Sequence, residues 1–105
     1  MLKSIDDTSF KELIRENTDP AVLYFTGKWC KPCQTFGPVV ELVSQRMEND
    51  IRFFKADMDE TEITASELGI RSLPSLVLFD GGMIRDLQSG TMTAEEIRLW
   101  IQENI

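Results

Sequence analysis

Short apolar runs alternate along the chain with segments in which apolar residues recur every three or four positions. The runs predict β-strands at residues 2–5, 21–25, 51–57, 76–79 and 83–88. The recurring spacing predicts amphipathic helices that begin near Asp7, Lys31, Asp59 and Thr93. The expected order of elements is therefore strand, helix, strand, helix, strand, helix, strand, strand, helix.

Capping residues mark the ends of several predicted elements. Asp59, followed by Glu62, predicts the start of the third helix, and Gly69 predicts its end. Thr93 and Glu96 have the spacing of a capping box for the last helix. The helix faces expected to point inward carry the following residues: Phe10, Leu13 and Ile14; Phe36, Val39 or Val40, Val43 and Met47; Ile97, Trp100 and Ile101.

The order of elements predicts an α/β fold. Strand–helix–strand units in the first half imply parallel pairing. The sequence Asp80-Gly81-Gly82 predicts a hairpin turn that adds an antiparallel pair. We expect one domain over residues 1–105, built as a three-layer α/β/α sandwich with a mixed central sheet of about five strands and four helices.

Composition excludes several classes of function. The net charge of -7 repels a phosphate backbone, so we expect no nucleic-acid partner. The chain has no histidine, which excludes His-dependent nucleophilic catalysis and His-ligated metal sites. No apolar run approaches the roughly 20 residues that cross a bilayer. The N-terminus also lacks the apolar stretch of a signal peptide, so we expect a cytoplasmic protein without membrane contact, unless a leader has been removed.

The chemistry that remains centres on Trp29-Cys30-Lys31-Pro32-Cys33, which follows an apolar strand and opens the second helix. Two cysteines at this spacing share one helix face and are close enough to form a disulfide. Cys30 lies where the helix N-terminus stabilises an anion, so we expect it to be the thiolate nucleophile, with a lowered pKa. Cys33 is expected to be less exposed and to resolve the mixed disulfide. Pro32 suits a first turn, where its missing N–H has no helical partner.

Two other interpretations of the cysteine pair stay open. Buried cysteines can act simply as small apolar side chains. Two subunits could also each donate a pair to a metal ion or an iron–sulfur cluster, because one chain offers only two thiolates and no imidazole. The position on a strand-to-helix turn, with Trp29 before the pair and Lys31 within it, disfavours the first of these interpretations.

The combined motifs resemble the thioredoxin family. The resemblance covers essentially the whole chain and rests on Trp-Cys-x-Pro-Cys after an apolar strand, Pro38 in the following helix, the segment Gly69-Ile70-Arg71-Ser72-Leu73-Pro74, and the glycines Gly82 and Gly90. It implies a protein-disulfide reductase without a bound cofactor or metal. Its partners would be client proteins with disulfides and a separate flavin-containing thioredoxin reductase that reloads it, and we expect a monomer.

The resemblance also implies a client-binding surface. It implies that the peptide bond from Leu73 to Pro74 is cis and that the backbone before Pro74 pairs with an extended client segment. The residues expected on this surface are Trp29, Arg71, Ser72, Leu73, Pro74 and Gly90.

Tyr24 and Lys31 depart from the family pattern, and the change at Tyr24 leaves Lys55 without its usual partner. The family usually has a buried Asp, thought to remove the proton of the resolving cysteine, where this chain has Tyr24. A phenol is neutral at neutral pH, although it can donate a hydrogen bond to a thiolate. Lys31 replaces a usual Gly. Lys55, the usual partner of the missing Asp, is left to extend towards solvent or to pair with Asp57.

These departures predict an altered redox pair. Loss of a negative charge and gain of a positive one both favour a thiolate. We therefore expect Cys30 to have a lower pKa than in a typical thioredoxin, with Tyr24, Lys28, Lys31, Pro32 and Lys55 tuning the pair and making the disulfide more oxidising. Two alternatives to a reductase follow: a specialised oxidant or isomerase, and a protein-binding subunit that needs no redox chemistry.

Overall fold

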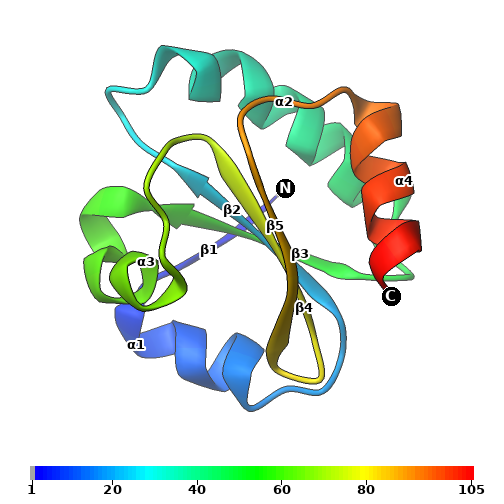
Figure 1. Cartoon of the computed structure of the whole chain (residues 1–105), viewed down its shortest axis with the longest axis horizontal. Coiled ribbons are helices and arrows are strands. Elements are labelled where there is room, and N and C mark those ends of the chain that lie inside the picture. The colour runs from blue at the N-terminus through cyan, green and yellow to red at the C-terminus, as the bar shows by residue number, and fades with distance from the viewer. Residues whose placement is uncertain (1) are drawn as a thin grey trace.

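The computed structural model describes residues 2–105 and contains one five-stranded sheet in the order β1-β3-β2-β4-β5 (Figure 1). The strands are β1 (Lys3–Ile5), β2 (Ala21–Thr26), β3 (Arg52–Asp57), β4 (Ser75–Asp80) and β5 (Met83–Ser89). Strand β3 pairs in parallel with β1 and β2, whereas β4 pairs antiparallel with β2 and β5. The predicted mixed sheet is confirmed.

Helices cover both faces of the sheet (Figure 1). On one face lie α1 (Asp7–Phe10) and α3 (Glu62–Leu68), and on the other lie α2 (Lys31–Arg46) and α4 (Ala94–Asn104). A π-helical turn, Lys11–Arg15, extends α1, and a 3₁₀ turn, Met58–Glu60, precedes α3. The predicted three-layer α/β/α arrangement is confirmed. No helix within residues 2–105 combines the length and apolar character needed to span a bilayer.

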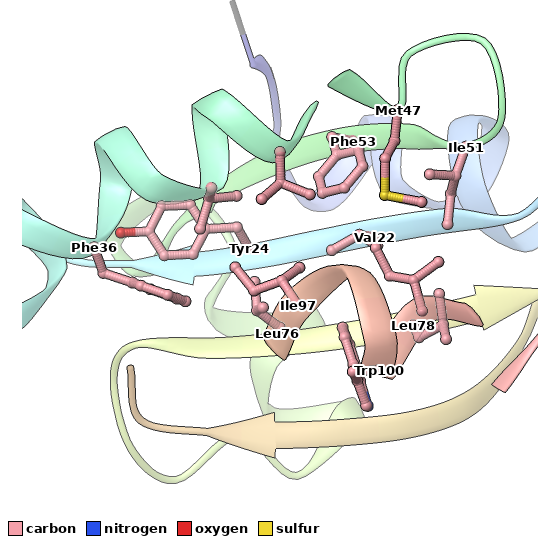
Figure 2. Close-up of a cluster of buried hydrophobic side chains, with 13 residues drawn as sticks. Val22, Tyr24, Phe36, Met47, Ile51, Phe53, Leu76, Leu78, Ile97 and Trp100 are labelled. Carbon is pink, nitrogen blue, oxygen red and sulfur yellow. The ribbon is translucent and has the colours of Figure 1, made fainter. Parts of the chain in front are cut away.

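Strand β2 is the centre of the molecule because both of its faces are covered. Val22 and Tyr24 pack into the core beneath α2 and α4 (Figure 2), while Leu23 and Phe25 pack into the core beneath α1 and α3. A strand buried on both faces needs apolar residues at consecutive positions, which explains the unbroken run from Ala21 to Phe25. The strand ends at the turn that leads to the cysteines, so this core fixes the base of the site.

The start of α3 corrects the prediction that Asp59 caps it. Asp57 instead caps the 3₁₀ turn, accepting a hydrogen bond from the N–H of Asp59 at 2.9 Å, and Thr61 occupies the N-cap of α3 without a side-chain bond. The carboxylate of Asp7 supplies the missing acceptor and takes the N–H of Thr64 at 2.8 Å. Because this cap comes from α1, nothing in the sequence around Asp59 indicates it.

Two further local signals are confirmed. Thr93 and Glu96 form their reciprocal capping box at the start of α4. Gly81 and Gly82, with φ of 65° and 79°, make the turn between β4 and β5. Gly82 has a second reason to be glycine, since a side chain there would collide with the backbone carbonyl of Arg15. The hairpin therefore packs tightly against the end of the π-helical turn.

Candidate redox site

Cys30 and Cys33 form a disulfide at the junction of β2 and α2. Cys30 is the N-cap of α2 in an extended conformation, with a Cα–Cα distance of 5.2 Å to Cys33. Pro32 lies in the first turn, as expected from its missing N–H. The predicted pairing is thus confirmed, and it uses both cysteines of the chain.

The two sulfur atoms have different surroundings. Cys33 is 3% exposed and faces the core, whereas Cys30 is only partly buried. The N–H of Cys33 donates a hydrogen bond to Sγ of Cys30 at 3.2 Å. The first turn of a helix carries partial positive charge, so this geometry stabilises a negative charge on the outer sulfur. The outer sulfur is therefore the one placed to meet a partner molecule.

A groove of about 650 Å³, here called the cysteine groove, opens beside Cys30. Its lining consists of Trp29, Cys30, Lys31, Pro32, Met58, Ile70, Arg71, Ser72 and Leu73. Trp29 is 95% exposed, so its indole has almost no partner within the chain. Met58 and Ile70 were not among the predicted site residues. Met58 follows directly on the end of β3, and the carboxyl ends of parallel strands share one edge of a sheet, which is the signal that could have located it.

The loop before β4 supplies the far wall of this groove. The peptide bond from Leu73 to Pro74 is cis, as the resemblance implied. Leu73 packs so closely on Gly27 that a methyl group there would lie 2.9 Å from Cδ1 of the leucine. Gly90 and Pro74 do not line the groove; Gly90 donates its N–H to the carbonyl of Pro74 at 2.9 Å. This hydrogen bond joins the loop to the residue that follows β5.

Comparison with known proteins identifies the family. The family model described as Thioredoxin matches residues 1–103. The chain belongs to the thioredoxin family. It is 30% identical to the thioredoxin of Rickettsia typhi and 31% identical to that of Rickettsia prowazekii, each over 105 residues and the full length of both chains. It is 39% identical to the thioredoxin of a Synechocystis species over 88 residues, which is 84% of this chain and 82% of the relative. The pair of Cys30 and Cys33 is the redox-active disulfide of this oxidoreductase family.

Tyr24, expected from the family resemblance to replace a carboxylate, lies buried behind the inner cysteine. Its side chain is 2% exposed and packs edge-to-face on Phe36, with ring centroids 5.7 Å apart (Figure 2). Its hydroxyl donates to the backbone carbonyl of Cys33 at 3.0 Å. In this disulfide-bonded form the hydroxyl therefore binds the main chain of Cys33. Burial raises the pKa of Tyr24, partly offset by a hydrogen bond with Thr26, so the phenol stays neutral and offers no carboxylate base.

A second groove, of about 620 Å³, lies behind Cys33 between α2 and the sheet. Tyr24, Thr26, Cys33, Gln34 and Lys55 are among the residues that line it. Lys55 is paired in register with Tyr24 and shares its face of the sheet. Cys33 lines this second groove and not the cysteine groove.

Lys55 does not pair with Asp57, which corrects that alternative. The carboxylate of Asp57 is committed to the cap of the 3₁₀ turn, and no ion pair joins it to Lys55. The lysine lies half-buried along the wall of the second groove instead, with its stem against the sheet. A positive charge thus borders the same groove as Cys33.

Proposed function

We propose that this thioredoxin reduces disulfides of client proteins, with Cys30 as the nucleophile and Cys33 as the resolving thiol. The observation that carries the proposal is the unequal placement of two bonded sulfur atoms. One lies at a helix N-terminus beside an open groove, and the other is buried within bonding distance behind it. An exposed, stabilised thiolate is the form that attacks a disulfide.

The exchange proceeds in two steps from the reduced form. The thiolate of Cys30 attacks one client sulfur, so that the client S–S bond breaks and its other sulfur leaves as a thiolate, which takes a proton. Cys33 then loses its proton and attacks Sγ of Cys30, which breaks the mixed disulfide and releases the second client thiolate. Two electrons and two protons pass to the client, and the Cys30–Cys33 disulfide forms. A separate flavin-containing thioredoxin reductase returns the pair to the dithiol.

The surrounding residues have distinct parts in this proposal. Trp29 and Leu73 contact apolar residues of the client, and the backbone of Ser72 and Leu73 pairs with its extended chain, with Pro74 and Gly90 holding that loop. Lys28 and Lys31 favour the thiolate of Cys30.

The proton of Cys33 needs a separate exit, because Tyr24 is neutral and cannot accept it. It leaves to solvent through the second groove, past Lys55. We place the protein in the cytoplasm as a monomer, by its likeness to the thioredoxins that it matches.

Insulin reduction coupled to NADPH oxidation by a thioredoxin reductase tests the proposal. The wild-type chain is expected to sustain turnover, Cys30→Ser to abolish it, and Cys33→Ser to accumulate a covalent adduct with the client through Cys30. Thr35→Ser, an exposed change in the same helix turn, is the matched control and should keep full activity. Turnover by Cys30→Ser, or an adduct through Cys33 in place of Cys30, would contradict the assigned roles.

A specialised oxidant or isomerase is the second candidate. It is favoured by one observation, the neutral Tyr24 at the position where the family usually has a carboxylate. Removing that negative charge stabilises the thiolate form, and a stabilised reduced form raises the reduction potential. The reduction potential of the pair therefore separates the two candidates.

A further inference from the structure

The cysteine groove is cationic although the molecule is acidic. The chain carries 18 carboxylates and a net charge of -7, yet none of the nine residues that line the groove is acidic. Two of the nine, Lys31 and Arg71, are basic, and both are exposed. Within residues 2–105, no carboxylate lies within 4.0 Å of either side chain.

Several cations elsewhere on the surface are paired. The ion pairs of the described residues outside the site join Lys11 to Glu16, Arg15 to Glu67, Arg85 to Asp80 and Arg98 to Glu95. Lys28, next to the groove, is 4.0 Å from Asp59, and both side chains are more than half exposed. Solvent screens such a pair strongly. The groove thus presents unpaired positive charge beside the reactive sulfur.

The two cations come from different walls of the groove. Lys31 is the first residue of α2, and Arg71 lies in the loop between α3 and β4. The apolar side chains of Trp29, Ile70 and Leu73 line the same groove. An extended segment lying in the groove would therefore meet both apolar surface and the two cations.

We propose that the groove selects client disulfides that lie in acidic protein segments, with Lys31 and Arg71 as the residues that determine this specificity. The inference rests on the proposed reductase function and adds the class of client. Carboxylates on the client would form ion pairs with Lys31 and Arg71, which have no such partner within residues 2–105. The apolar lining favours a protein segment over a small anionic disulfide, because the latter leaves Trp29 and Leu73 uncovered.

Ionic strength determines where this selectivity can be seen. The net charge of -7 repels an acidic client at long range, which opposes the local attraction. At about 0.1 M salt the Debye length is about 10 Å, so the repulsion from distant charges is largely screened while contacts inside the groove are not. At about 1 M the Debye length falls to about 3 Å, and the groove contacts weaken too.

Two cyclic peptides test the proposal. Each has one disulfide and the same apolar residues, with two Glu in one peptide and two Lys in the other. The single-turnover rate with the pre-reduced chain is divided by the rate of the same peptide with dithiothreitol, which also attacks as a thiolate, so differences in the intrinsic reactivity of the two disulfides towards a thiolate are removed. At about 0.1 M salt the Glu peptide should be reduced roughly tenfold faster than the Lys peptide, with the ratio falling towards one at about 1 M.

A pair of charge-matched variants assigns the effect to the groove. Lys31→Gln with Arg71→Gln, and the control Lys3→Gln with Arg46→Gln, each remove two positive charges and take the net charge from -7 to -9. Lys3 and Arg46 are exposed and lie outside the groove. The groove variant should lower the Glu-to-Lys ratio to below about twofold, and the control should keep it. The ratio cancels any change that Lys31→Gln makes to the reactivity of Cys30.

The outcomes separate this inference from the proposed function. Equal normalised rates for the two peptides, or an unchanged ratio in the groove variant, would overturn the selectivity while leaving disulfide reduction intact. Reduction of neither peptide would overturn both. Oxidised glutathione, a small anionic disulfide, should be slower than the Glu peptide after the same normalisation, and an equal or faster rate would overturn the choice of a protein segment.

Discussion

Tyr24 ties the core of the protein to the inner cysteine through one hydrogen bond. Its hydroxyl holds the carbonyl of Cys33, and its ring fills the space between β2 and Phe36. A buried phenol keeps its proton at neutral pH, so this residue positions the helix turn and takes no part in proton transfer. In the proposed mechanism, the resolving step then depends on solvent in the second groove.

Replacing Tyr24 with Asp should therefore speed the resolving step. A carboxylate behind Cys33 can accept its proton, and its negative charge disfavours both thiolates, so the mixed disulfide should decay several-fold faster and the pKa of Cys30 should rise. Rapid-quench measurement of mixed-disulfide decay, with a thiolate titration, checks both effects.

The matched variant Tyr24→Phe keeps the ring and removes only the hydroxyl. It leaves the Cys33 carbonyl without its donor, so we expect a loss of about 1–2 kcal/mol in the free energy of unfolding and no faster decay. If Tyr24→Asp folds and changes neither the decay rate nor the pKa, Tyr24 has only a packing role.

Cys30 is expected to have a thiol pKa below about 7, the value for a typical thioredoxin. The helix N-terminus, the N–H of Cys33 and the two neighbouring lysines all favour its thiolate. Titration of thiolate ultraviolet absorbance measures the value, and Lys31→Gly should raise it. A value of about 7.5 or higher in the wild-type chain would contradict the expected stabilisation.

At the scale of elements, α3 depends on a cap from α1. The carboxylate of Asp7 accepts from the hydroxyl of Thr64 at 2.7 Å and from two backbone N–H groups of the first turn. Hydrogen bonds from the Thr64 side chain and then from its backbone hold the pKa of Asp7 below its usual range. One charged group thus joins two helices on the same face of the sheet.

This contact predicts a loss of stability in acid. Because the folded pKa of Asp7 lies below the unfolded value of about 3.9, its contribution is present above that value and is lost as the pH falls through the folded pKa. Asp7→Asn should lower the urea midpoint at neutral pH and flatten its decline below about pH 4. Asp50→Asn, at an exposed turn, is the control and should leave the midpoint unchanged. Equal midpoints for all three chains would contradict a role for this cap.

The elements that the sequence predicted correctly are those with local signals. The capping box of Thr93 and Glu96 lies within one turn, and the period of the apolar residues places the buried faces of α2 and α4. The cap of α3 comes from Asp7, 57 positions before Thr64, so a local pattern at Asp59 was misleading. The π-helical turn at Lys11–Arg15 was also missed, because burial of Phe10 and Ile14 is compatible with an ordinary helical turn.

The site residues also differ in whether a local sequence signal predicted them. Cys30 and Cys33 share one turn and could be paired from their spacing, whereas the cis bond before Pro74 followed only from the family resemblance. Met58 lies where the carboxyl ends of parallel strands meet, so the strand order could have located it. The position of Ile70 depends on the path of the loop after α3, which no local pattern contains. The partner of the Tyr24 hydroxyl required the position of a backbone carbonyl, so sequence alone left it open.

The whole molecule places a reactive pair at one end of a rigid sheet. Two cores hold β2 from both faces, and Trp100 fixes α4 to the edge strand by donating to Asp86 at 2.6 Å. We expect the helix N-terminus and the local cations to stabilise the reduced form and so to raise the reduction potential, while the fold and the family are those of thioredoxins. The reduction potential of the pair decides whether the protein reduces client disulfides or oxidises client thiols.

Equilibration of the protein with defined ratios of reduced and oxidised glutathione measures that potential directly, with the reduced fraction counted by thiol alkylation and mass spectrometry. We predict a reduction potential closer to about -270 mV than to about -180 mV, displaced from the former to the less negative side. A potential of about -180 mV or higher would contradict a reductase and assign the pair of Cys30 and Cys33 to oxidation or isomerisation of client disulfides.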